Sequence, residues 1–237
     1  MRTQARAAHD FGRRAVFGPG PAAPVPERGA GVPLRLLFVC TANISRSPYA
    51  ELRARQLLLP ADACEAADGP LWVVSSAGVP GLSDRHMDPQ MRRRALERGV
   101  PADSCDAHRS RPVDAALVED CDLILTMEKR HRNAVLDTYP TALGRILMLG
   151  QAAHAARRLS GDARCAQEGA GGLVPRLVRA APRASGRLDV PDPYRREEEV
   201  SRRVASLIDD YLVTIASLVR EACTPLATVA TERGGAV

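Results

Sequence analysis

The stretch that decides the fold is LRLLFVCTANISRSPYAE, residues 34–51. Its first six residues (34–39) are an apolar run rich in Leu, Phe and Val, which predicts a short buried β-strand. Cys40 follows this run directly, and Arg46 follows Cys40 after five residues. Ser47 suits an N-cap and the proline after it suits a first helical turn, so we expect a helix to begin there. The stretch therefore predicts a strand, a short loop and a helix, with the cysteine and the arginine at the two ends of the loop.

A loop of this kind is suited to binding an oxyanion. Its backbone N–H groups would point inward, and the helix adds the positive end of its dipole. The same field favours the thiolate of Cys40, which is the nucleophilic form of the side chain. The planar guanidinium of Arg46 can bind two oxygens of a phosphate at once. The alternative is a buried and inert cysteine at a strand end.

Composition and charge limit the possible functions. The 237 residues include 45% hydrophobic but only 3% aromatic residues, so we expect one core filled by aliphatic side chains. The net charge of +5 is carried almost wholly by scattered arginines, which favours a solvated surface, with weak steering of anionic substrates as the functional alternative. Nucleic-acid binding is disfavoured because few aromatic residues accompany the arginines.

Cysteine spacing and apolar runs indicate the compartment. No two cysteines have the Cys-x2-Cys spacing, which disfavours a zinc site. No signal-peptide core and no transmembrane run is present, so we expect no insertion into a membrane. A thiolate nucleophile needs a reducing compartment, and we therefore expect a cytoplasmic protein.

The remaining chain alternates strands and helices. We expect residues 1–33 to be a flexible Pro/Gly/Arg-rich extension, 34–222 to be the domain, and 223–237 to be a flexible tail. Residues 150–188, where glycines interrupt two possible helices around 151–159 and 173–181, are expected to be a surface insertion, or less favourably a specificity lid. The other expected strands are 71–76, 121–127 and 145–149, and the other expected helices are 48–59, 89–98, 113–118, 128–136 and 195–222. This alternation predicts an α/β fold with a parallel sheet and ligands at the carboxyl ends of the strands.

The loop Cys40-x5-Arg46-Ser-Pro resembles the signature of the low-molecular-weight protein tyrosine phosphatases. Asp192-Pro193-Tyr194, directly before the last amphipathic helix, resembles the acid loop of the same family. The resemblance runs from about Leu34 to the final helix, with a break at 150–188. It implies a four-stranded parallel sheet flanked by helices in a flavodoxin-like order.

The resemblance also implies a mechanism and a substrate class. Cys40 would be the nucleophile, Arg46 would hold the phosphate and Asp192 would be the general acid, with Tyr194 at the pocket wall and phosphotyrosine-containing proteins as substrates. Neither a metal nor another cofactor is needed. Nothing in the sequence indicates an oligomeric state. The implied phosphate-binding residues are Thr41, Ala42, Asn43, Ile44, Ser45, Arg46 and Ser47.

The resemblance further implies a supporting hydrogen-bond network of four side chains. Its members would be Asn43, Ser47, Ser76 and His108, although a merely packed or solvated His108 is an open alternative. Two residues depart from the family pattern. Ala42 replaces a common glycine, and Ser45 stands where many members carry a second cysteine, so a protective disulfide with Cys40 inside the loop is not possible.

Two other functions are compatible with parts of this pattern. A thioredoxin-coupled arsenate reductase of the same fold would need resolving cysteines, and Cys105 and Cys121 are the candidates. The Asp-Pro-Tyr loop has no role in such a reductase. A non-catalytic phosphotyrosine-binding module would be expected to lack Cys40 or Asp192, and both are present.

Overall fold

The computed structural model describes residues 34–58 and 72–223, without the side chains of 163, 166–171 and 223. The expectations for residues 1–33 and for the tail after 223 lie outside the described residues. Among the residues that are described, no helix is both long and apolar enough to cross a membrane.

A four-stranded parallel sheet lies at the centre, in the order β2-β1-β3-β4. The strands are β1 (Leu34–Cys40), β2 (Trp72–Gly78), β3 (Leu123–Thr126) and β4 (Ile146–Met148). β3 and β4 are buried along their whole length, because helices cover both faces of the sheet. The predicted α/β fold with a parallel sheet is therefore confirmed.

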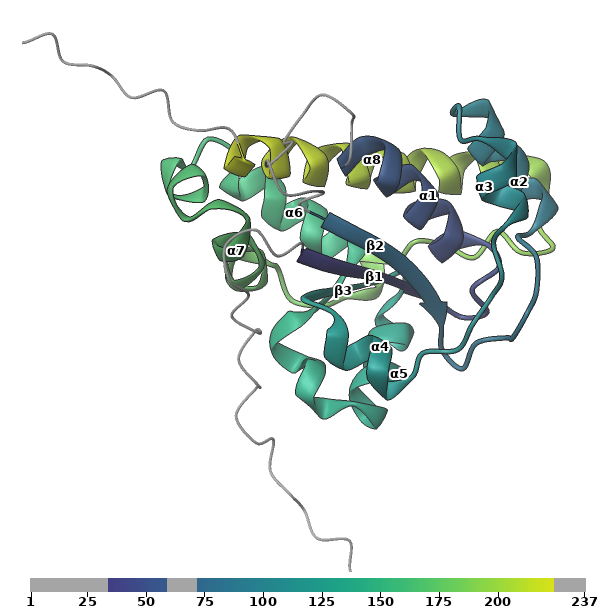
Figure 1. The fold of residues 1–237 in the computed structure, drawn as a ribbon, viewed down its shortest axis with the longest axis horizontal. Helices are drawn as coiled ribbons and strands as arrows, with labels where there is room; N and C mark the ends of the chain where they lie inside the picture. The colour runs from purple at the N-terminus through teal and green to yellow at the C-terminus, as the bar shows by residue number, and fades with distance from the viewer. Residues whose placement is uncertain (1–33, 59–71, 224–237) are drawn as a thin grey trace, which may run out of the picture.

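Helices form a layer on each side of the sheet (Figure 1). One layer contains α1 (Arg46–Leu58), α2 (Pro89–Glu97), α3 (Ala102–Asp106), α6 (Leu149–Leu159), α7 (Ala163–Ala180) and α8 (Glu198–Cys223). The other contains α4 (Ala115–Asp120) and α5 (Lys129–Thr138), with a 3₁₀ turn at Pro140–Arg145; a second 3₁₀ turn lies at Gly186–Leu188. The larger hydrophobic core lies under α1, α6, α7 and α8, and a smaller one lies under α4 and α5.

The candidate site lies at the carboxyl ends of β1 and β2. Cys40, the last residue of β1, is in register with Gly78, the last residue of β2. A Cβ on Gly78 would lie 2.7 Å from the carbonyl oxygen of Thr41 and 2.9 Å from the carbonyl carbon of Ala42. Only glycine lets the loop after β1 pass this close to β2.

The structure corrects two expectations. Ser47 does not cap α1, because the helix begins at Arg46 and the Ser47 hydroxyl lies among Cys40, Asn43 and Ala77 instead. Residues 150–188 are not a surface insertion. The buried side chains that they add to the larger core are Ala152, Ala153, Ala155, Ala156, Cys165, Leu173, Val174 and Leu177. The predicted helix at 151–159 is present, whereas the second helix begins at Ala163, ten residues before its predicted start.

Candidate active site

The loop between β1 and α1 encloses the sulfur of Cys40. This side chain is only 2% exposed, and its Sγ lies 3.0 Å from the hydroxyl oxygen of Ser47. The Ser47 hydroxyl also lies 3.2 Å from the carbonyl oxygen of Ala77, and it has one hydrogen to donate to either partner. When Cys40 is a thiolate, donation to the sulfur is the stronger bond, because a charged acceptor strengthens a hydrogen bond.

Asn43 carries the turn of this loop. Its φ of +56° lies in the left-handed region, where asparagine is among the few residues other than glycine that are tolerated. The side-chain amide donates to the Ser47 hydroxyl at 3.0 Å and to the Ser76 hydroxyl at 2.8 Å. His108 Nε2 lies 2.8 Å from the Asn43 carbonyl oxygen, and the backbone N–H of Arg111 donates to Asn43 Oδ1 at 3.0 Å. The four side chains of the expected network thus lie together. The backbone N–H of Arg111 also belongs to this network, and the sequence did not indicate it.

Arg46 is buried beneath the loop, with 1% of its side chain exposed. Its Nη1 donates to the carbonyl oxygen of Val190 at 2.9 Å and to Oε1 of Glu128. Its Nη2 lies 3.0 Å from Oδ2 of Asp192 and 3.5 Å from the hydroxyl of Thr41. The arginine therefore joins the loop after β1 to the loop after β3 and to the acid loop.

Glu128 is a site residue that the sequence reasoning missed. It is 15% exposed and accepts hydrogen bonds from Arg46 and from both Nε and Nη2 of Arg130. Burial acts to raise its pKa, but the bonds from Arg130 and Arg46 outweigh burial, and the net pKa lies below that of a free glutamate. The sequence did contain a signal for this residue, because Glu128 follows the third buried strand and so lies at the sheet edge where Cys40 lies.

The acid loop is fastened to the same edge of the sheet. Val190 N–H donates to the carbonyl oxygen of Met127 at 2.8 Å, and Asp189 Oδ1 accepts from the backbone N–H of Lys129 at 2.8 Å. These bonds place Asp192, which is 40% exposed, against Arg46. Tyr194 is 42% exposed, and its backbone N–H donates to Asp192 Oδ1 at 3.2 Å.

Thr41 and His131 form a second contact under the loop. His131 is 2% exposed, and its Nε2 lies 2.8 Å from the Thr41 hydroxyl. Burial and then the charge of Arg46 lower the pKa of His131 to about 4. The imidazole is therefore neutral near pH 7, which avoids placing a second cation beside Arg46.

Two buried polar atoms of the loop have no hydrogen-bond partner among the described residues. They are Nε of Arg46 and the hydroxyl oxygen of Ser45. Buried polar groups are nearly always paired, and a ligand within the loop would supply the partners that these two atoms lack. An oxyanion within the loop would accept from Arg46 Nε and from the N–H groups at the start of α1.

The sequence model of the family described as "Low molecular weight phosphotyrosine protein phosphatase" matches residues 35–164, more than half of the chain. The chain belongs to this family. The match includes residues 40–47 and Glu128 but ends before Asp192, so it does not cover the Asp-Pro-Tyr segment.

Relatives support this family membership. The chain is 34% identical over 116 residues to the low molecular weight protein-tyrosine-phosphatase Etp of Escherichia coli K12, covering 49% of this chain and 69% of Etp. It resembles the structure of Vibrio vulnificus Wzb in complex with benzylphosphonate, with 26% identity and a TM-score of 0.54, covering 77% of this chain and 97% of Wzb. The YwlE arginine phosphatase from Geobacillus stearothermophilus, at 23% identity and a TM-score of 0.55, covers 78% of this chain and 91% of its own and shows the shared fold alone.

Proposed function

We propose that the protein hydrolyses phosphotyrosine in protein substrates through a phosphocysteine intermediate. The observation that carries this proposal is the convergence of Cys40, Arg46 and Asp192 at one sheet edge, with Arg46 Nε buried and unpaired. A nucleophile, an anion binder and an acid at one place are what phosphoryl transfer through cysteine requires.

In the first step the Cys40 thiolate attacks phosphorus, and the bond from phosphorus to the tyrosine oxygen breaks. Asp192 in its protonated form gives its proton to the departing phenolate. Arg46 and the backbone N–H groups of residues 41–47 hold the three non-bridging oxygens as charge moves between them. The products of this step are the dephosphorylated tyrosine, phosphocysteine and the Asp192 carboxylate.

In the second step water attacks the phosphorus of phosphocysteine and releases inorganic phosphate. The Asp192 carboxylate takes the proton from this water, which restores the starting acid. The Ser47 hydroxyl, 3.0 Å from the sulfur, donates to the leaving thiolate. The chemistry needs no metal, because Arg46 and the amino end of α1 supply the positive potential.

The substrate class and the compartment are the finer parts of the proposal. Cys40 lies at the bottom of the loop with 2% exposure, which suits the long phosphotyrosine side chain better than the short phosphoserine. Tyr194 at the mouth can stack near the substrate ring. A free thiolate requires reducing conditions, and we therefore place the protein in the cytoplasm.

The cysteine environment argues against arsenate reduction. Cys105 and Cys121 are 1% and 4% exposed. Burial raises the pKa of both thiols, to about 12 for Cys121, which disfavours the thiolates that a resolving cysteine must form. A silent binding module is disfavoured by the Asp192 carboxylate lying against Arg46, since binding alone does not need an acid there.

The test is hydrolysis of para-nitrophenyl phosphate by the reduced protein in EDTA, beside Cys40→Ser and Asp192→Asn. We expect Cys40→Ser to be inactive and Asp192→Asn to lose roughly 10²–10⁴-fold in kcat, the usual contribution of a general acid. Asp210→Asn, which changes an exposed aspartate of α8, is the matched control and should retain full activity. A Cys40→Ser protein as active as the wild type would overturn the mechanism.

Peptide substrates separate the specificities that the fold accommodates. Phosphotyrosyl, phosphoseryl and phosphoarginyl peptides of one sequence are compared by release of inorganic phosphate. We expect the highest kcat/KM with phosphotyrosine. Activity confined to phosphoarginine would overturn the substrate class but leave the phosphocysteine mechanism intact. No activity on any of them, with thioredoxin-dependent arsenate reduction, would replace the proposal with the reductase.

A further inference from the structure

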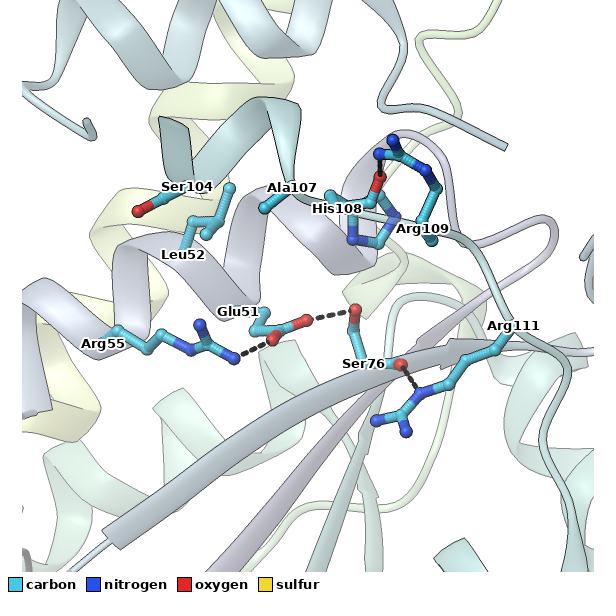
Figure 2. Close-up of a pocket in the computed structure, with 9 residues that line it drawn as sticks. All are labelled: Glu51, Leu52, Arg55, Ser76, Ser104, Ala107, His108, Arg109 and Arg111. Carbon is cyan, nitrogen blue, oxygen red and sulfur yellow. Dashed lines mark hydrogen bonds and ion pairs between the residues drawn. The ribbon is translucent and has the colours of Figure 1, made fainter. Parts of the chain in front are cut away.

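A second cavity lies beside the phosphate loop, and the mechanism does not use it. Its volume is about 320 Å³, and it is lined by one face of α1, by Ser76 of β2 and by residues between Ser104 and Arg111 (Figure 2). None of the residues that line it belongs to the loop at 40–47 or to the acid loop. The volume is at the lower end of the range of small-molecule sites.

The cavity carries an excess of positive charge. Its one carboxylate, Glu51, is 12% exposed and is occupied by Arg55 and by the Ser76 hydroxyl at 2.5 Å (Figure 2). Arg111 uses only its Nε, which donates to the Ser76 carbonyl oxygen at 3.0 Å. Its two terminal nitrogens have no partner among the described residues. Arg109 donates through Nη1 to two backbone carbonyl oxygens, and its Nε lies 3.6 Å from the exposed Asp84. An anion can therefore gain the free donors of Arg111 and compete with Asp84 for Arg109.

The wall of the cavity is bonded to the residue that shapes the phosphate loop. Three lining residues hold Asn43: Ser76 through its hydroxyl, His108 through its ring and Arg111 through its backbone N–H. Asn43 has a φ of +56°, a conformation that persists only when its surroundings hold it. A ligand that moves any of these residues acts on the loop that binds phosphate.

We propose that this cavity is a second anion site, which binds a small oxyanion ligand of the phosphate-monoester type and changes the activity of the phosphate loop through Asn43.

The chemistry of the wall supports an oxyanion in particular. The planar fork of Arg111 presents two parallel donors, which suit the oxygens of a phosphate or sulfate group. His108 must carry its hydrogen on Nε2, because a carbonyl oxygen only accepts. Burial lowers the pKa of His108, so the ring stays neutral near pH 7 and the positive charge of the wall comes from the arginines. Leu52 and Ala107 give the cavity an apolar side against which the organic part of a monoester can pack.

Binding is measured first, with sulfate as the probe and without any need for activity. The full chain labelled with ¹⁵N is titrated with sodium sulfate, and sodium chloride of equal ionic strength is the control. We expect saturable shifts at the Arg111 Nε–H and at the backbone amides of Ala107 and His108. In Arg109→Gln/Arg111→Gln the dissociation constant measured at these two backbone amides should rise at least tenfold, while shifts at residues 41–47 persist. Arg203→Gln, which changes a side chain on α8 that is 71% exposed, should bind as the wild type does.

Kinetics then test the coupling, which rests on the proposed phosphatase activity. Sulfate in the phosphate loop competes with substrate and raises the KM for para-nitrophenyl phosphate. Sulfate in the second cavity should in addition change kcat at least twofold. The double variant should retain the rise in KM and lose the change in kcat, each compared with its own rate without sulfate.

Three outcomes overturn the proposal. Equal shifts with chloride, or shifts that remain in the double variant, would show that no site exists. Saturable binding in the cavity with no change in kcat would remove the coupling to the loop. If the protein has no phosphatase activity, the titration still decides whether the site exists, so failure of the proposed function is distinguishable from failure of this one.

Discussion

Replacing Glu128 by glutamine tests whether this carboxylate holds Arg46 in place. Glu128 and Arg46 are 15% and 1% exposed, so the pair is largely buried. Breaking a buried ion pair by removing one charge typically costs about 3–5 kcal/mol. Glutamine retains an oxygen that accepts from Nη1, and Val190 and Asp192 still contact the guanidinium. We therefore expect less than this full cost, a loss of about 2 kcal/mol in the free energy of unfolding, because some of the interaction remains.

The substitution of Glu128 should also lower kcat/KM. When a phosphate occupies the loop it competes with Asp192 for Nη2 of Arg46, which leaves Glu128 as the carboxylate that fixes the guanidinium. If the whole 2 kcal/mol is felt in the transition state, kcat/KM falls roughly 30-fold. In a domain of this size the same free energy lowers the melting temperature by about 4–8 °C.

The assay combines thermal unfolding with steady-state hydrolysis of para-nitrophenyl phosphate. Glu119→Gln, which changes an exposed glutamate of α4, is the matched control and should leave both quantities unchanged. A Glu128→Gln protein that melts within 2 °C of the wild type and keeps kcat/KM within threefold would refute the claim that the carboxylate positions Arg46.

Three further predictions concern the loop and its surroundings. Gly78→Ala should destabilise the fold by about 1–3 kcal/mol and distort the loop, because its Cβ would lie within 2.9 Å of three backbone atoms. Denaturant unfolding measures this loss. Gly186→Ala is the control, because no atom lies closer than 3.4 Å to its Cβ. The pKa of His131 is about 4 in the folded protein, against an ordinary value of 6.5. The ring therefore stays neutral while the unfolded chain binds a proton, and stability should fall as the pH falls from about 7 to 4. The loss should reach about 3 kcal/mol, and urea unfolding of His131→Gln should show a flatter dependence in this window. Peroxide should oxidise Cys40 and inactivate the protein, and thiol should restore little of the activity. Ser45→Cys should improve this recovery, because the new cysteine offers a disulfide partner. Full recovery of the wild-type activity would contradict this reasoning.

The parts of the site that the sequence predicted are those encoded in contiguous motifs. Cys40 and Arg46 share one loop, and Asp192 is part of a short motif before a strongly amphipathic helix. Residues that act on this loop from other elements were harder to find. Glu128 and His131 follow the third strand, at the N-cap and in the first turn of α5, and only the sheet order brings them under the loop.

The two errors have a common physical origin, because in both a tertiary contact outweighed a local preference. Ser47 followed by proline is a local signal for a helix start, but the hydroxyl bonds to Asn43 and Ala77 and so cannot cap. In residues 150–188 the glycines suggested an irregular surface segment. Alanines 152, 153, 155 and 156 instead form a face with at most 1% exposure, and alanine carries too little hydropathy to mark a buried face from sequence.

In the proposed mechanism the guanidinium of Arg46 divides its donors between holding the fold and binding the phosphate. Nη1 of Arg46 is committed to Glu128 and to the Val190 carbonyl, so it ties the acid loop to the sheet edge. Nη2 lies on Asp192, and Nε is unpaired, so these two donors face the side where the ligand binds. A lysine would supply the charge from a single nitrogen and could not keep both sets of partners. A phosphate that accepts from Nε and Nη2 must displace the Asp192 carboxylate. In the proposed mechanism the same event fills the loop and releases Asp192 toward the oxygen that it would protonate.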